Sequence, residues 1–164
     1  MSTDESSSGA VAPDLSPYRG EFRYVFYARP GTYDQTVAFY EQTLGFQIVG
    51  GFGGPEPPRG TYVQASTGVI EVLDEATGGG EDAELKAQVL DAGQIYQAPR
   101  GAFLLIEVAD VDRLARRVRK CGGILHQEVR DWEWRFRDFK VVDPSGNLLC
   151  VFSRRPGWEA YHQA

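Results

Sequence analysis

The sequence predicts an α+β fold made of two β-α-β-β-β modules, and three observations lead to this prediction. Short apolar and aromatic stretches, typical of strands, outnumber the stretches with helical periodicity. Each of the two amphipathic helical stretches follows a strand-like stretch and ends at a glycine. A shift of 79 residues lays the second half of the chain on the first, with Tyr24 on Phe103 and Glu71 on Cys150. Repetition of one order of elements indicates two copies of a module.

The first module starts with a predicted strand at 22–28, where nearly every residue is apolar or aromatic. A helix is expected within 32–45, because Gly45 is a typical helix end and apolar side chains recur at helical spacing before it. These side chains are Tyr33, Val37, Tyr40 and Leu44. Three more strands are predicted at 46–52, 61–66 and 69–74.

The second module repeats this order, with a strand at 102–108 and a helix that begins after Asp110, a candidate N-cap. The predicted buried face of this helix consists of Val111, Leu114, Ala115, Val118 and Cys121. The remaining strands are expected at 123–129, 134–143 and 147–153. The last two are joined by residues 143–146, which have proline and glycine where a type I turn with a following left-handed residue favours them.

The chain is expected to form one domain between two tails. The domain covers 21–155, divided into module one (21–75), a linker (76–101) and module two (102–155). The linker contains three consecutive glycines and a stretch, 81–92, that can form a short polar helix. Residues 1–20 have little to bury and are expected to be a flexible tail, and 156–164 a C-terminal tail.

Composition excludes several classes of protein. The formal net charge of −6 argues against a general affinity for nucleic acid phosphates. No apolar run reaches membrane-spanning length and the N-terminus lacks signal-peptide features, so we expect a cytoplasmic protein without a membrane partner. Cys121 and Cys150 have no spacing typical of a disulfide framework or zinc site, and both are expected to be reduced and buried.

Three stretches carry a family resemblance: 37–46 at the end of the first helix, 106–123 around the second, and 141–152 at the last turn and strand. Together they resemble the vicinal oxygen chelate superfamily, which includes glyoxalase I, bleomycin-resistance proteins and extradiol dioxygenases. The resemblance implies paired modules whose mixed sheets curl into a cup that holds a metal or a ligand. It also implies a homodimer, because in the bleomycin-resistance branch the cups commonly form between two chains.

Catalytic members of this superfamily hold a divalent metal with His, Gln or Glu side chains in the cup. The resemblance places the corresponding positions at Tyr24, Glu71, Phe103 and Cys150. Only Glu71 retains a ligand type of the family, and a cysteine is a soft ligand that suits magnesium or manganese poorly. We therefore expect no metal and no cofactor, and we interpret Cys150 as the mark of a lost metal site.

Strand alternation predicts which side chains line the cup. The expected ligand-binding residues are Tyr24, Phe26, Glu71, Phe103, Leu105, Glu107, Trp132, Trp134, Cys150 and Phe152. Val25 is among the residues expected beneath the helices. Aromatic strand residues can equally be core, whereas an inward Glu71 needs a partner, which can be a ligand, water or an arginine such as Arg23 or Arg135.

These residues predict a metal-independent binder of an aromatic or cationic metabolite or antibiotic. The alternative is an enzyme of the same superfamily, a lyase, isomerase or dioxygenase, with an altered metal site or with Glu71 or His126 as acid or base. A third possibility is a partner domain that keeps only the fold. No catalytic residue is identified from the sequence.

Overall fold

The computed structural model describes residues 23–76 and 103–161. The predicted N-terminal tail and the possible helix at 81–92 lie outside these residues. No helix in the described ranges is long and apolar enough to cross a membrane.

Module one has the predicted order of elements. They are β1 (Arg23–Tyr27), α1 (Tyr33–Ala38), a π-helical segment η1 (Phe39–Thr43), β2 (Gln47–Phe52), β3 (Gly60–Ala65) and β4 (Gly68–Leu73). The strands form one sheet in the order β1-β4-β3-β2, in which β1 and β4 are parallel and the other pairs antiparallel. The predicted helix is thus present, with its last turn widened.

Module two repeats this architecture. Its elements are β5 (Leu104–Glu107), α3 (Val111–Lys120), β6 (Leu125–Asp131), β7 (Phe136–Val142) and β8 (Leu148–Arg154). The sheet order is β5-β8-β7-β6, again with one parallel pair, β5 and β8. A short helix, α4 (Trp158–Tyr161), follows β8. The predicted α+β fold of two β-α-β-β-β modules is therefore confirmed.

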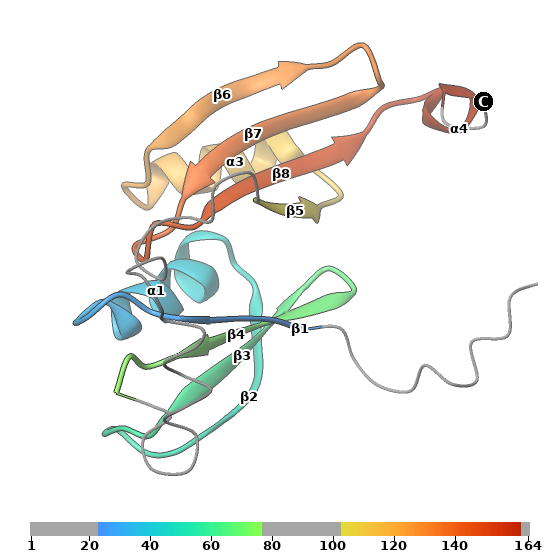
Figure 1. Cartoon of the computed structure of the whole chain (residues 1–164). Helices are drawn as coiled ribbons and strands as arrows, with labels where there is room; N and C mark the ends of the chain where they lie inside the picture. The colour runs from blue at the N-terminus through green and yellow to red at the C-terminus, as the bar shows by residue number, and fades with distance from the viewer. Residues whose placement is uncertain (1–22, 77–102, 162–164) are drawn as a thin grey trace, which may run out of the picture.

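In Figure 1 the sheet of module two is in the upper part of the view and the sheet of module one in the lower part. The edge strands β1 and β5 are the strands of each sheet that face the other module. A polar junction joins the modules on the helix side: Tyr40 donates a hydrogen bond to Asp143 at 2.8 Å, and the hydroxyls of Thr36 and Ser145 lie 2.7 Å apart. Burial raises the pKa of Asp143, while its hydrogen bonds oppose this shift. The predicted turn at 143–146 is thus part of the contact between modules.

Helix α3 forms as its sequence predicts, with one exception. Asp110 caps it, because the Asp110 side chain accepts a hydrogen bond from the Arg113 backbone N–H at 2.8 Å. The buried residues of α3 are Val111, Leu114, Ala115 and Val118. The prediction that Cys121 is buried is wrong, because Cys121 lies beyond the last helical turn as the C-cap, where helical periodicity no longer applies, and is exposed.

The predicted orientation of β1 is also wrong. Val25 pairs with Glu71 and Leu105 with Cys150, so the first strands of the modules are related by 80 residues and the last strands by 79. A single shift therefore misplaced β1 by one residue, and such a slip exchanges the two faces of a strand. Tyr24 and Phe26 pack with the core, and Val25 stands on the face opposite the helices.

Candidate functional site: the cup face of module two and the adjoining cleft

The sheet of module two has a face turned away from α3, which we call the cup face of module two. Strand pairing places Leu105, Cys150 and Lys140 in one row across it, and Glu107, Phe152 and Asp138 in the next. Leu104 and Ile106 point to the other side, as the sequence predicted.

A buried carboxylate organises this face. Asp138 is 4% exposed, and its Oδ1 accepts hydrogen bonds from Trp132 Nε1 at 2.8 Å and from Gln127 Nε2 at 2.9 Å. Its Oδ2 accepts one from Cys150 Sγ at 3.1 Å and lies 3.8 Å from Lys140 Nζ. A buried carboxylate that accepts this many hydrogen bonds holds each donor in place.

The Cys150 thiol is therefore part of this hydrogen-bond network, with Asp138 as its acceptor. Burial, followed by the hydrogen bond to Asp138 and the charge of Asp138, raises the pKa of the Cys150 thiol to about 12. The thiol is the poor form for both metal binding and nucleophilic attack. Cys150 is thus a hydrogen-bond donor within the sheet.

Two groups of stacked rings border the cup face. Trp132 and Trp134, in the turn between β6 and β7, have ring centroids 4.3 Å apart, and the Arg130 guanidinium lies 3.4 Å from the Trp132 ring. In the second group, Phe136 stacks on Phe152 at 4.3 Å and on Trp158 at 4.7 Å. The strand predicted at 134–143 begins only at Phe136, so the tryptophans belong to the turn.

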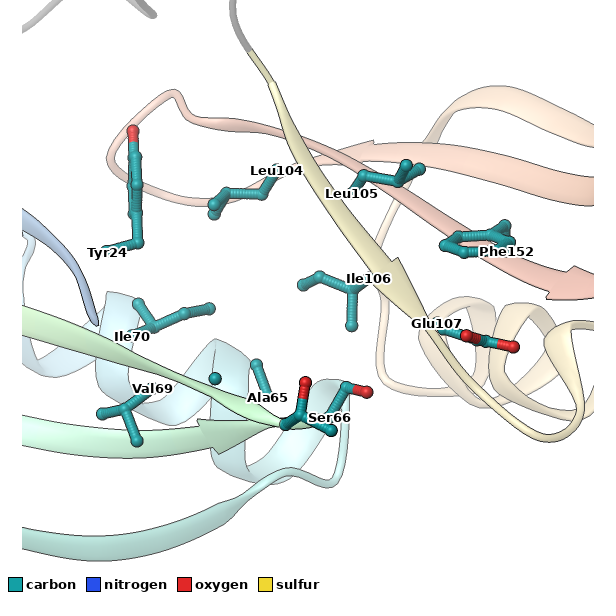
Figure 2. A pocket seen from close by; sticks show the side chains of 12 residues that line it. Tyr24, Ala65, Ser66, Val69, Ile70, Leu104, Leu105, Ile106, Glu107 and Phe152 are labelled. Carbon is teal, nitrogen blue, oxygen red and sulfur yellow. The ribbon is translucent and has the colours of Figure 1, made fainter. Parts of the chain in front are cut away.

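A cleft of about 370 Å³ lies beside the cup face, between the two modules. Figure 2 shows Ala65 and Ile70 on one side of it and Leu104 and Ile106 on the other. Among the described residues that line it, Glu107 is the only Asp, Glu, Lys or Arg side chain, and the volume falls within the usual range of ligand pockets. The cleft is therefore a mostly apolar site with one carboxylate at its wall.

Glu71 lies apart from this cleft, on the corresponding face of module one. Its carboxylate pairs with Arg23, with Oε2 and Nη1 3.3 Å apart, and its side chain is 15% exposed. The Arg23 guanidinium also lies 4.5 Å from the Tyr62 ring. Arg23, one of the partners considered for Glu71 from the sequence, is the partner that the structure provides.

The structure places the predicted site residues in four surroundings, and some residues belong to two of them. Tyr24, Leu105, Glu107 and Phe152 border the cleft between the modules. The strands and turn of the module-two cup carry Leu105, Glu107, Trp132, Trp134, Cys150 and Phe152, and Phe103 directly precedes β5. Glu71 lies on the module-one face, and Phe26 is buried in the core.

Sequence reasoning missed Asp138, Lys140 and Trp158. The first two stand between aromatic and basic residues, and only the register of β7 against β8 reveals that they adjoin Phe152 and Cys150. Trp158 follows Pro156 and Gly157 in a segment without periodicity, so no pattern predicted that it belongs to the site. The one available signal was the presence of a tryptophan in a mostly polar segment.

The residues at the family's metal positions do not form a donor set. Glu71 is paired with Arg23, and the Cys150 thiol is protonated and bonded to Asp138. On the first strand of each module, the residues that pair with Glu71 and Cys150 are Val25 and Leu105, whose side chains have no atom that can bind a metal. Within residues 23–76 and 103–161, no three His, Cys, Asp or Glu side chains gather at one point.

Known proteins similar to this chain share its fold. A bleomycin resistance protein from Geobacillus stearothermophilus is 29% identical over 126 residues, which cover 76% of this chain and 90% of that protein. The structure of TioX from Micromonospora sp. ML1 has a TM-score of 0.64 at 19% identity, covering 83% of this chain and 99% of TioX. TnmS3, an antibiotic binding protein from Streptomyces sp. CB03234, has a TM-score of 0.54 at 19% identity, covering 79% and 93%.

The family model also matches, over residues 25–151, which include both modules. This range spans most of the described elements, from β1 to β8. The chain belongs to the Glyoxalase/Bleomycin resistance protein/Dioxygenase superfamily.

Proposed function

We propose that this protein binds a planar aromatic small molecule, a metabolite or an antibiotic, on the cup face of module two without a metal ion. The observation that carries the proposal is the stacked pair Trp132 and Trp134, whose Trp132 ring is fixed by a hydrogen bond to the buried Asp138. Flat ligands gain stacking energy on such rings, and a ring that is already ordered loses little entropy on binding.

The relatives support a binding role. The curated proteins similar to this chain are bleomycin resistance proteins, and TnmS3 is an antibiotic binding protein. The geometry adds a mostly apolar cleft of ligand size that shares Leu105, Glu107 and Phe152 with the cup face. We therefore place the ligand across the cup face and the cleft.

Its position and exposure favour Glu107 over Glu71 as the carboxylate that receives a cationic part of the ligand. Both carboxylates have an arginine partner, Arg23 for Glu71 and Arg154 for Glu107. Glu107 borders the cleft and its side chain is 39% exposed, so a ligand can reach it. Glu71 is less exposed and lies on the other module.

Metal independence is part of the proposal. It is supported by the chemistry of the residues at the family's metal positions, because a protonated thiol and a carboxylate already paired with arginine are poor ligands. Binding by stacking and ion pairing requires no Lewis acid.

An enzymatic role has less support from the geometry. His126, considered as a general base, is exposed on β6 and borders a shallow hollow with Ile124 and Val142. It does not line the cleft, and the Cys150 thiol has a raised pKa. These positions favour binding over acid–base or nucleophilic catalysis.

A homodimer belongs to the same proposal. Val25, Phe103 and Leu105 are each about half exposed, on or directly beside the edge strands β1 and β5. A second copy would cover this apolar surface and close the cups. Light scattering coupled to size-exclusion chromatography is expected to give twice the chain mass, and a monomer at micromolar concentration would contradict this part.

Calorimetric titration of the purified protein in EDTA tests the proposal. Bleomycin, the planar cation 9-aminoacridine and uncharged acridine at pH 8 serve as ligands. We expect binding of at least the planar cation, weakened about three- to tenfold by Trp134→Ala and little by Trp134→Phe, which keeps a ring. Equal affinity of the two variants, or binding only after a divalent metal is added, would contradict the proposal.

A further inference from the structure

Arg154 connects the wall of the cleft with the C-terminal turn. Its Nη2 lies 3.0 Å from Oε2 of Glu107, and its guanidinium carbon lies 4.8 Å from the ring centroid of Trp158. Within residues 23–76 and 103–161, Glu107 is the only Asp, Glu, Lys or Arg side chain that lines the cleft. The guanidinium thus occupies the place where a cationic ligand group would meet that carboxylate.

Backbone hydrogen bonds hold the segment between β8 and Trp158, and the Trp158 ring contacts Phe136 of β7. The Arg155 N–H donates to the Arg135 carbonyl at 2.8 Å, and the Trp158 N–H donates to the Arg155 carbonyl at 3.1 Å. Gly157 has φ +86°, which a side chain would strain. The Trp158 ring completes the stack with Phe136 and Phe152.

Glu107 and Trp158 are therefore linked in two ways. Phe152, the strand neighbour of Glu107, borders the cleft and begins the ring stack that ends at Trp158. Arg154 bridges the same two ends through its ion pair and its contact with the indole.

We propose that Arg154 is a specificity-determining residue of the cleft: a cationic ligand group displaces its guanidinium from Glu107, and this displacement loosens Trp158. The inference rests on the proposed function, because it concerns the ligand of the same site. Arg154 acts as a built-in competitor, so only a ligand whose cation pairs better with Glu107 replaces it. An exposed ion pair of this kind is weak enough to be exchanged.

Titration of variants with the matched ligands 9-aminoacridine and acridine tests the competition. Because a bound cation no longer has to displace a guanidinium, Arg154→Gln is expected to tighten binding of the cation about two- to fivefold and to leave acridine unchanged. Glu107→Gln is expected to reduce the preference for the cation over acridine to near unity. The control is Arg113→Gln, which removes one positive charge from an exposed position on α3 and should match the wild type.

Fluorine NMR of protein labelled with 5-fluorotryptophan tests the link to the turn without any ligand. Trp158→Phe assigns the Trp158 resonance. We expect both Arg154→Gln and Glu107→Gln to shift this resonance in the same direction, and Arg113→Gln to leave it in place.

The outcomes separate the two proposals. If the wild-type protein binds neither 9-aminoacridine nor acridine, the proposed function is contradicted. The fluorine spectra still decide in that case whether Glu107 affects Trp158. A wild type that binds the cation, with Arg154→Gln unchanged or weaker, overturns the competition. A Trp158 resonance that does not respond to Glu107→Gln overturns the link.

Discussion

The cup faces of the two modules have the same backbone frame but different side chains at matching positions. Strand pairing matches Glu71 of module one with Cys150 of module two, Tyr62 with Lys140 and Gly60 with Asp138. In module one the carboxylate stands on the last strand and pairs with Arg23, which is partly exposed. In module two it stands on the neighbouring strand, is buried and fixes Trp132.

Gly60 explains why module one cannot form the same network. A Cβ at this position would lie 2.5 Å from Cε1 of Phe52 and 2.9 Å from Cδ2 of Leu73. The Phe52 ring therefore covers the place that Asp138 occupies in module two. The comparison teaches that the two modules share the sheet but not the polar anchor, and that in module two this anchor is a buried carboxylate that holds the Trp132 ring by a hydrogen bond.

On the helix side the modules remain alike. Arg59 binds Asp34 of the first turn of α1 and Asp74, and Arg137 binds Asp112 of the first turn of α3 and Asp131. Each arginine thus fastens a helix start to its sheet. The cup faces differ at the positions compared above, and these are the faces where a ligand is expected.

The largest expected effect concerns Cys150, the counterpart of Glu71. With a pKa of about 12, this thiol has roughly a thousandfold less thiolate at pH 8 than an ordinary cysteine, and burial slows its reaction further. A thiol reagent such as DTNB should therefore label the exposed Cys121 quickly and Cys150 only after unfolding. The variant Cys121→Ser is expected to show no fast phase, and a fast phase in it would contradict the burial of Cys150.

A smaller but still large effect separates the two carboxylates. Asp138→Ala leaves the partly buried donors of Trp132 and Gln127 without this acceptor and should lower the free energy of unfolding by about 2–3 kcal/mol. Glu71→Ala breaks an ion pair whose arginine is solvated and should cost about 1 kcal/mol or less. Urea unfolding of both variants measures the difference, and equal losses would mean that the two anchors are equivalent.

The smallest effect is a pH dependence at Asp112. Its hydrogen bond with Arg137 lowers the pKa of the Asp112 carboxyl, so the resulting stability is complete above the usual carboxyl pKa of about 4 and is lost as pH falls through the lowered value. Asp112→Asn should therefore reduce Tm at neutral pH and flatten its decline below about pH 4. Parallel Tm profiles for wild type and variant would count against this pair.

The order of elements could be predicted because its signals are local. Helical spacing, the Asp110 cap and the glycines that end helices each act within a few residues, and they place every predicted helix and strand of the described modules. The orientation of β1 could not be predicted in the same way. Residues 22–28 are apolar or aromatic at nearly every position, so no alternation distinguishes its two faces.

The site could be predicted in part. The predicted orientation of Leu105, Glu107 and Phe152 toward the cup face agrees with the strand register, because β5 and β8 have opposed faces that their sequence pattern reveals. Asp138 was missed because its role depends on hydrogen bonds to the preceding strand and turn, across a register that two irregularities interrupt. Trp158 was missed because a tertiary contact, and no local pattern, determines where its ring lies.

The indole N–H of Trp132 offers the most direct test of the central claim, that module two binds a planar ligand on rings fixed by Asp138 and needs no metal. Nitrogen–proton NMR of the protein in EDTA, titrated with 9-aminoacridine, follows this resonance. The account predicts a saturable shift of the Trp132 and Trp134 indole signals, with the amide signals around Glu71 unchanged. Shifts confined to module one, or a response that appears only when a divalent metal is supplied, would contradict it.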